Sequence, residues 1–306
     1  MQETLTKPTE HKLNKTKLKN FAVSARNKLI DAVKQTAYRY GFPDNIGAQE
    51  LADGIIINGK AYDKHVKSLR FQTSLEIQKK SFDEVIEEVA YTWFNRFIAL
   101  KFMEANGYLS YNYSFFTSAN HLDTNINYIP DIVTNAHKAN IGALDRNLIL
   151  ELQDKHAEEE LFKQLIIEAS HQLHQTMPDI FSSTKGDHTE LLFPNNLLKV
   201  DSFLHDLSTM VPEDNWKQVE IIGWFYQFYI NEKKAEVDKM KKSGKKLGRK
   251  EIPAATQLFT PHWVVQYMVE NSLGKLYALN FRDTKLKSKS KWNYDSCSTE
   301  SLENAR

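Results

Sequence analysis

The sequence has only one cysteine, Cys297, among its 306 residues, so a disulfide framework within one chain is excluded. Glycine and proline are scarce, at 11 and 8 residues, which indicates long helices and few tight turns. No uninterrupted run of about 18 apolar residues occurs, so no membrane-spanning helix is expected. The polar, lysine-rich first 20 residues lack the apolar core of a secretory signal. These absences predict a cytoplasmic protein without membrane contact.

An excess of charge of one sign is also absent. Lys and Arg number 40 and Asp and Glu 39, a net charge of +1, so contact with nucleic acid would have to come from a local segment. Hydrophobic residues make up 41% and aromatic residues 11%, which is enough for a real core. The length allows one large domain or two ordinary ones.

Established catalytic signatures are missing as well. There is no H-E-x-x-H, no G-x-S-x-G and no phosphate-binding glycine loop. His171 and His174 stand three apart on an expected helix, a spacing that can serve a metal, but no third ligand is suggested and a structural role is favoured. The aromatic run at 223–229 can stack on bases, although its helical spacing favours a place in the core.

The pattern of apolar residues predicts a mainly α-helical protein. Helical spacing begins at Leu18 and ends before Gly41, and Ser81 to Glu84 forms a capping box that starts a second long helix ending at Asn106-Gly107. Other helices are expected at 46–53, 62–79, 145–154, 157–176, 195–210 and 216–242.

Composition divides the chain into five expected parts. These are a flexible leader at 1–16, a helical domain at 17–232 with an irregular surface insertion at 108–141, a basic linker at 233–251, a segment at 252–279, and a polar, disordered tail at 280–306.

The basic segment is a candidate for DNA contact. Residues 233–250 hold nine Lys or Arg and two acidic residues, and such a segment can neutralise phosphates without reading sequence. A solvated helix end that leads into a linker is the alternative. The candidate DNA-binding residues are Lys239, Lys241, Lys242, Lys245, Lys246, Arg249 and Lys250.

A Gln-Leu-Phe-Thr-Pro corner at 257–261 precedes an apolar helical stretch that ends at Gly274. Thr260 suits the N-cap and Pro261 the first helical position, so helix capping accounts for both. Capping does not account for Gln257 and Phe259.

This corner and the helix after it resemble motif X of N6-adenine DNA methyltransferases. Three further stretches, at 17–42, 91–109 and 219–234, resemble the beginning of the PglX family, the adenine-specific DNA methyltransferases of BREX phage-exclusion systems. Residues 190–202 and 244–261 fit the same family, so that the resemblance covers roughly 17–279.

The resemblance implies S-adenosylmethionine as the cofactor of the intact enzyme. Phe259, Thr260 and Pro261 would then lie beside the methionine end of the cofactor, once a catalytic domain is present. It also implies double-stranded DNA as substrate, other BREX proteins as partners and a role in phage defence.

The departures from the family pattern matter equally. The 306 residues contain no Pro-Pro pair and no two glycines two apart, so they lack both the glycine-rich cofactor loop and the N-P-P-Y motif that holds a flipped base. We therefore expect a truncated, helical N-terminal domain that ends at the motif X helix, with the Rossmann-like core absent or only begun. No catalytic residue is assigned, and this chain alone is expected to be inactive. The alternative is a non-enzymatic helical module that binds DNA or protein.

Overall fold

The computed structural model describes residues 14–44, 47–117, 128–139, 141–142, 144–181, 187–248, 251–256, 260 and 262–280. Its contacts divide the chain into two compact units, Met1–Glu232 (unit 1) and Lys233–Arg306 (unit 2). Helices dominate the described residues of both units, which confirms the prediction of a mainly α protein.

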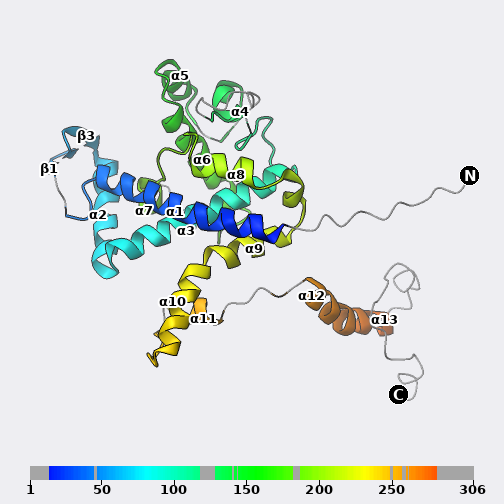
Figure 1. Cartoon of the computed structure of the whole chain (residues 1–306). Coiled ribbons are helices and arrows are strands. Elements are labelled where there is room, and N and C mark those ends of the chain that lie inside the picture. The colour runs from blue at the N-terminus through cyan, green and yellow to red at the C-terminus, as the bar shows by residue number, and fades with distance from the viewer. Residues whose placement is uncertain are drawn as a thin grey trace, which may run out of the picture. The chain divides into compact units, whose positions relative to one another are not determined.

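Unit 1 contains helices of very different length. Their bounds are α1 Lys15–Arg39, α2 Lys64–Lys79, α3 Phe82–Ala105, α4 Asp131–Thr134, η1 Ala136–Lys138, α5 Arg146–Asp154, α6 Glu158–His174, α7 His188–Leu191, α8 Phe203–Met210, η2 Glu213–Lys217 and α9 Glu220–Tyr229. Helix α1 packs against α3, α8 and α9, and the core forms around it (Figure 1). Large aromatic side chains fill much of this core, including Phe21, Trp93, Phe94, Phe97, Phe203, Trp216 and Phe225.

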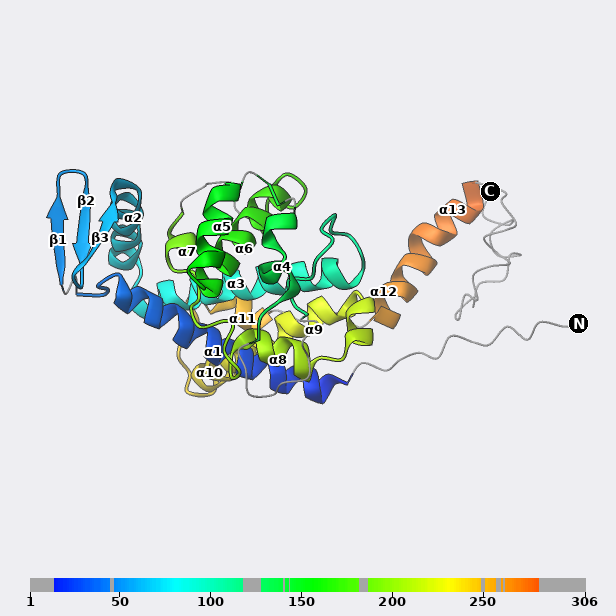
Figure 2. The ribbon, with the colours of Figure 1, turned by 90° about the horizontal axis from the view of Figure 1, so that it is seen from above.

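A small antiparallel sheet stands where the sequence predicted a helix at 46–53, so that prediction was wrong. Strands β1 Ala48–Leu51, β2 Gly54–Ile57 and β3 Lys60–Asp63 pair in the order β1-β2-β3. The Asn58-Gly59 turn between β2 and β3 has positive φ at both residues, 51° and 79°, which suits a tight hairpin and not a helix. Ile55 and Ile57 alternate into the interior, and Figure 2 shows the sheet at one end of unit 1 beside α2.

The two ends of α3 are those predicted from the sequence. The Ser81 hydroxyl accepts a hydrogen bond from the amide of Glu84 at 3.2 Å. At the other end Gly107 has φ 68°, its amide donates to the Glu104 carbonyl, and the amide of Tyr108 donates to the Met103 carbonyl. This pair of bonds is the Schellman arrangement, which satisfies carbonyls that the helix leaves open.

The Ser81 cap supports a stability prediction. Ser81→Ala removes the acceptor for a helix amide and should lower the free energy of unfolding by about 1 kcal/mol. Ser81→Asp keeps an acceptor near the positive end of the helix and should remain close to the wild type. Urea unfolding of the three proteins measures this, and equal losses in both variants would contradict a capping role.

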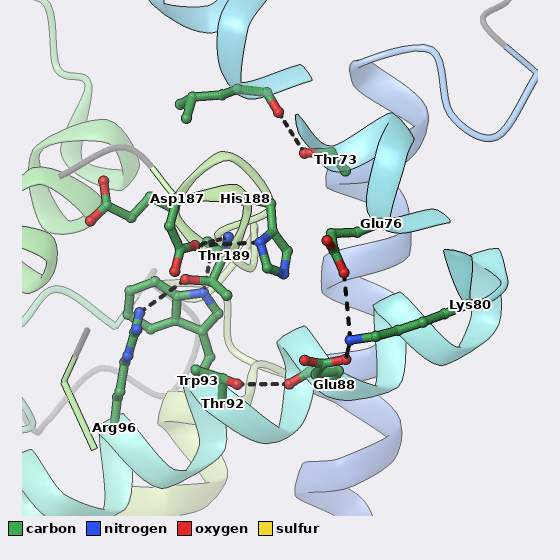
Figure 3. A network of polar contacts seen from close by, with 12 residues as sticks. Thr73, Glu76, Lys80, Glu88, Thr92, Trp93, Arg96, Asp187, His188 and Thr189 are labelled. Carbon is green, nitrogen blue, oxygen red and sulfur yellow. Dashed lines mark hydrogen bonds and ion pairs between the residues drawn. The ribbon is translucent and has the colours of Figure 1, made fainter. Parts of the chain in front are cut away.

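A polar network joins α2, α3 and α7. Figure 3 shows Trp93 and Arg96 of α3 directed at Thr189. The Trp93 indole donates to the Thr189 carbonyl at 2.8 Å, and the Arg96 guanidinium donates to the Thr189 hydroxyl at 3.3 Å. Lys80 bridges Glu76 and Glu88 at the nearby end of α2. These contacts tie α7, nearly 100 residues away in sequence, to the middle of α3.

Three other expectations need correction. The expected helix at 195–210 begins only at Phe203, because the amides of Leu197 and Leu198 donate to the Glu159 carboxylate and not to carbonyls of a helix.

The single helix expected at 216–242 is divided into η2, α9 and α10. The Trp216 carbonyl accepts from Asn106 Nδ2 at 2.8 Å, and Gln218 then adopts an extended conformation.

The insertion expected on the surface at 108–141 is also partly wrong. Phe115 and Phe116 are fully buried, and the backbone amide of Phe115 is held by the Glu104 carboxylate at 2.6 Å. Short helices α4 and η1 follow, and Ile132, Val133 and Ala136 of these helices enter the core. Residues 118–127 lie outside the described part of the chain.

Unit 2 contains α10 Asn231–Lys242 (which starts two residues before the boundary), α11 Ile252–Thr256, α12 His262–Val269, the π-helical segment η3 Glu270–Gly274 and α13 Lys275–Asn280. Most described side chains from Trp263 to Tyr277 are exposed, although many are apolar. Among the residues described, no helix combines the length and hydropathy needed to cross a bilayer. The tail predicted at 280–306 lies outside the described residues from 281 onward, as does the leader up to residue 13.

Candidate nucleic-acid interface

The basic segment is a helix with a defined end. Helix α10 stops at a Schellman arrangement in which Gly244, with φ 73°, donates to the Lys241 carbonyl and Lys245 donates to the Met240 carbonyl. Gly244 therefore serves as a helix stop and not as part of a phosphate loop. The turn sets the pair Lys241 and Lys242 before the stop and the pair Lys245 and Lys246 after it.

The lysines on this helix end are presented to solvent. Among the α10 side chains that the structure describes, Val237 is the buried one, at 2% exposure. The five described candidates are all exposed, namely Lys239, Lys241, Lys242, Lys245 and Lys246. The Lys241 ammonium nitrogen lies 4.0 Å from a carboxylate oxygen of Asp238. An exposed ion pair of this kind contributes little to the free energy of folding. Three of the lysines occupy the last turn of α10, where the negative end of the helix dipole stabilises cations. These charges therefore stabilise the end of α10, and their contact with phosphate stays a prediction.

The remaining candidates are described only in part. Arg249 and Lys250 lie outside the described residues, and so do Phe259 and Pro261 of the expected cofactor corner. Thr260 is described and exposed, two residues before α12 begins. The assignment of this corner to the cofactor stays a prediction.

The two histidines on α6 have different partners. His171 Nε2 lies 2.5 Å from the Glu190 carboxylate, and His174 Nδ1 lies 2.7 Å from the Phe181 carbonyl. Within the described ranges, no group of three His, Cys, Asp or Glu side chains is arranged to hold a metal ion. Each ring joins α6 to a later segment of the chain.

The aromatic run at 223–229 is mainly in the core, as its spacing predicted. Phe225, Phe228 and Tyr229 are 0%, 9% and 5% exposed. Trp224 stacks on Phe228, and the ammonium of Lys15 lies 4.0 Å from the centroid of its indole. The rings of this segment therefore stabilise the packing of α9 on α1 and α3.

The sequence pattern did not predict a cavity that lies beside α6. Residues spaced at i, i+3, i+4, i+7, i+8 and i+11 of this helix line it, namely Glu160, Lys163, Gln164, Ile167, Glu168 and His171. The periodicity was visible, but a mixed stripe of this kind is typical of an ordinary solvated helix face. The presence of strand β3 across from this helix face distinguishes the wall of a cavity from an ordinary solvated face.

Comparison with known proteins places the chain beside two adenine-specific methyltransferases. It is 36% identical over 285 residues to "Adenine-specific methyltransferase BrxX" of Escherichia coli O9:H4 (strain HS), an alignment covering 90% of this chain and 23% of that protein. It is 32% identical over 292 residues to "Adenine-specific methyltransferase PglX" of Lacticaseibacillus casei (strain Zhang), covering 87% of this chain and 23% of the relative. The chain thus spans about a quarter of the length of these relatives. No protein-family model matches it.

Proposed function

We propose that this chain, which belongs to the PglX family of BREX adenine-specific methyltransferases, supplies the helical N-terminal region of an S-adenosylmethionine-dependent adenine-N6 DNA methyltransferase. The observation that carries the proposal is 36% identity along 90% of this chain. In this proposal the intact enzyme marks host DNA in phage defence, works in the cytoplasm and meets other BREX proteins. The chain itself contributes DNA contact and the corner that flanks the cofactor.

DNA contact is assigned to the end of α10. The exposed lysines there, with Arg249 and Lys250 beyond them, would neutralise phosphates of double-stranded DNA. We expect retention on duplex DNA that falls with salt, and a shallower dependence on salt after Lys241, Lys242, Lys245 and Lys246 are changed to Gln. Loss of up to four phosphate contacts would lower the slope of log K against log salt by roughly 3 to 4. Fluorescence anisotropy across a salt series measures this slope.

A matched control separates this site from general charge. Lys64, Lys79, Lys138 and Lys155 are exposed in unit 1 and can be changed to Gln together. This variant has the same net charge as the α10 variant and should retain most of the slope. An equal loss in both variants would reject α10 as the interface, and absence of binding at low salt would reject DNA contact altogether.

Cofactor binding by the chain alone is expected to be absent. Phe259, Thr260 and Pro261 would flank the methionine end of the cofactor only beside a catalytic domain, and the glycine-rich loop and N-P-P-Y motif are missing from the 306 residues. Isothermal titration calorimetry with S-adenosylmethionine should detect no binding in the micromolar range. Transfer of labelled methyl groups to duplex DNA should also be absent, and either activity would overturn this part of the proposal.

A non-enzymatic module that binds DNA or protein is the second candidate. It is favoured by the exposed lysines of α10, which do not depend on any catalytic motif. The two candidates differ in whether DNA contact serves methylation. Joining this chain to the remaining length of a relative and assaying adenine methylation distinguishes them, because only the first candidate predicts that activity is recovered.

A further inference from the structure

A cavity of about 560 Å³ lies within unit 1 between strand β3 and helix α6. A second cavity of about 250 Å³ adjoins it, since Tyr40, Lys60, Tyr62, Glu160 and Lys163 line both. Neither cavity includes a residue assigned above to DNA or cofactor. The two together are called the β3–α6 groove.

One wall of the groove is a single face of α6. The stripe from Glu160 to His171 described above lines it, while Leu165 and Ile166 on the opposite face are fully buried in the core. Ile167 is the apolar member of this stripe, and its other members are polar or charged. Such a mixed face suits reversible contact with a partner better than permanent burial.

The other wall is an edge of the sheet. The order β1-β2-β3 places β3 at the edge, and the side chains of Lys60 and Tyr62, two residues apart, line the groove from it. The Lys60 ammonium lies 5.2 Å from the centroid of the Tyr62 ring. An edge strand offers unpaired backbone N–H and C=O groups at alternate residues, which an extended peptide can use as hydrogen-bond partners.

The interior of the groove is apolar in the middle and charged differently at its two ends. Aliphatic side chains line the middle, namely Val66, Leu69, Leu144, Leu148 and Ile167. The smaller cavity is lined by three cations, Arg39, Lys60 and Lys163, against two carboxylates, Glu159 and Glu160, so cations outnumber carboxylates there. The Glu159 carboxylate accepts from the amides of Leu197 and Leu198, and Glu160 accepts from Gln164.

The far end of the groove is acidic. Asp145, Glu168 and Glu190 line the larger cavity and not the smaller one. His171 joins this end, with Nε2 on Glu190 and with Nδ1 buried and without a hydrogen-bond partner. These carboxylates would repel the backbone of a nucleic acid, whereas a chain with one acidic and one basic side chain would satisfy both ends.

We infer that the β3–α6 groove binds an extended peptide segment of a partner protein as a fourth strand on β3. Side chains of a strand alternate between its faces, so residues two apart, about 7 Å, point into the groove together. The segment is expected to carry a large apolar residue at its centre, an acidic residue two positions to one side and a basic residue two positions to the other. This inference stands independently of the proposed function, because no DNA or cofactor residue takes part.

The test uses the full chain and labelled peptides with the pattern Asp-Thr-Leu-Thr-Lys, and the same pattern reversed, each between two flanking threonines. One order should bind with a dissociation constant below about 1 mM by fluorescence polarisation. Leu148→Glu, at a residue 36% exposed on the rim, should weaken binding at least about tenfold. Replacing the central leucine of the peptide with aspartate should do the same.

Charge exchange supplies the second variant. Lys163→Glu should weaken the preferred peptide, and a peptide whose aspartate is replaced by lysine should bind this variant better than it binds the wild type. Lys155→Glu, an exposed control on the end of α5, should change neither. Hydrogen exchange should slow at the amides of β3 when peptide is bound.

Three results would overturn the inference. They are absence of binding by both peptide orders at about 1 mM, binding that is unchanged in both Leu148→Glu and Lys163→Glu, and displacement of the peptide by a single-stranded oligonucleotide that binds more tightly. Circular dichroism confirms that each variant is folded before binding is compared.

Discussion

Trp93→Ala is expected to lower the free energy of unfolding by about 3–5 kcal/mol, the range for removal of a large aromatic side chain from a packed core. Trp93 is 0% exposed, and its ring meets Phe193 edge-on at 4.6 Å between centroids. The Arg96 guanidinium lies 4.6 Å from the ring centroid, and the indole donates to the Thr189 carbonyl. The variant therefore leaves a cavity, an unpaired carbonyl and an arginine that has lost its aromatic partner.

The size of this effect is a large share of the stability of a typical domain, about 5–15 kcal/mol. Urea unfolding followed by circular dichroism measures it. Trp263→Ala is the matched control, because Trp263 is 66% exposed and its removal should change stability by less than about 0.5 kcal/mol. Similar losses in the two variants would mean that Trp93 does not anchor α7 to α3 as described.

Lys101→Met should cost a similar amount, about 3–5 kcal/mol, because it leaves the largely buried Glu104 carboxylate without its cation. The second acidic partner, Glu213, is 60% exposed. Lys101 is 1% exposed, and its ammonium lies 3.1 Å from a Glu213 oxygen and 3.6 Å from a Glu104 oxygen. The Glu104 side chain is 16% exposed, and its carboxylate also accepts from the Ser114 hydroxyl and from the Phe115 amide. Methionine fills much of the volume of lysine, so the loss reports charge more than packing.

The loss in Lys101→Met should depend on pH. Burial raises the pKa of Glu104 above its usual value, while the Ser114 hydroxyl, Lys101 and the Phe115 amide oppose that rise. Without Lys101 the folded-state pKa rises further. A carboxyl with a raised folded-state pKa contributes stability that is complete below its unfolded pKa and is lost as pH rises through the folded pKa. The deficit of the variant is therefore expected to be larger at neutral pH than in the acidic range where carboxyl groups titrate.

Two controls separate charge from volume. Glu104→Gln in the Lys101→Met background removes the uncompensated carboxylate and should recover part of the stability at neutral pH. Lys155→Met breaks an exposed pair with Glu151 and should cost no more than about 1 kcal/mol. A deficit that is independent of pH and is not relieved by Glu104→Gln would show that lost packing, and not an unpaired charge, destabilises Lys101→Met.

The predictions that came from short-range signals agree with the structure. The capping serine at 81 and the left-handed glycine at 107 bound α3 as expected, because both act through hydrogen bonds within a few residues. The core position of Phe225 followed from helical spacing. Recognition of the PglX family from ordered stretches of sequence is confirmed by the two relatives.

The wrong predictions share a physical cause, which is competition from partners distant in sequence. Glu159 takes the amides of Leu197 and Leu198, about 40 residues away, and delays the start of α8. Asn106 takes the Trp216 carbonyl and interrupts an otherwise helical pattern. At 46–53 the apolar residues fit helix or strand alike, and pairing with β2 selects the strand.

The sequence by itself determined the helical class, the ends of α3, the position of the basic segment and the family, because each depends on local pattern or on the order of residues. Tertiary structure alone decided the sheet, the division of 216–242 and the β3–α6 groove. The groove joins Tyr40, strand β3, the first turns of α2, the start of α5 and one face of α6. No local propensity encodes a space between segments separated by about 100 residues, since its walls exist only after each segment has packed against the same core.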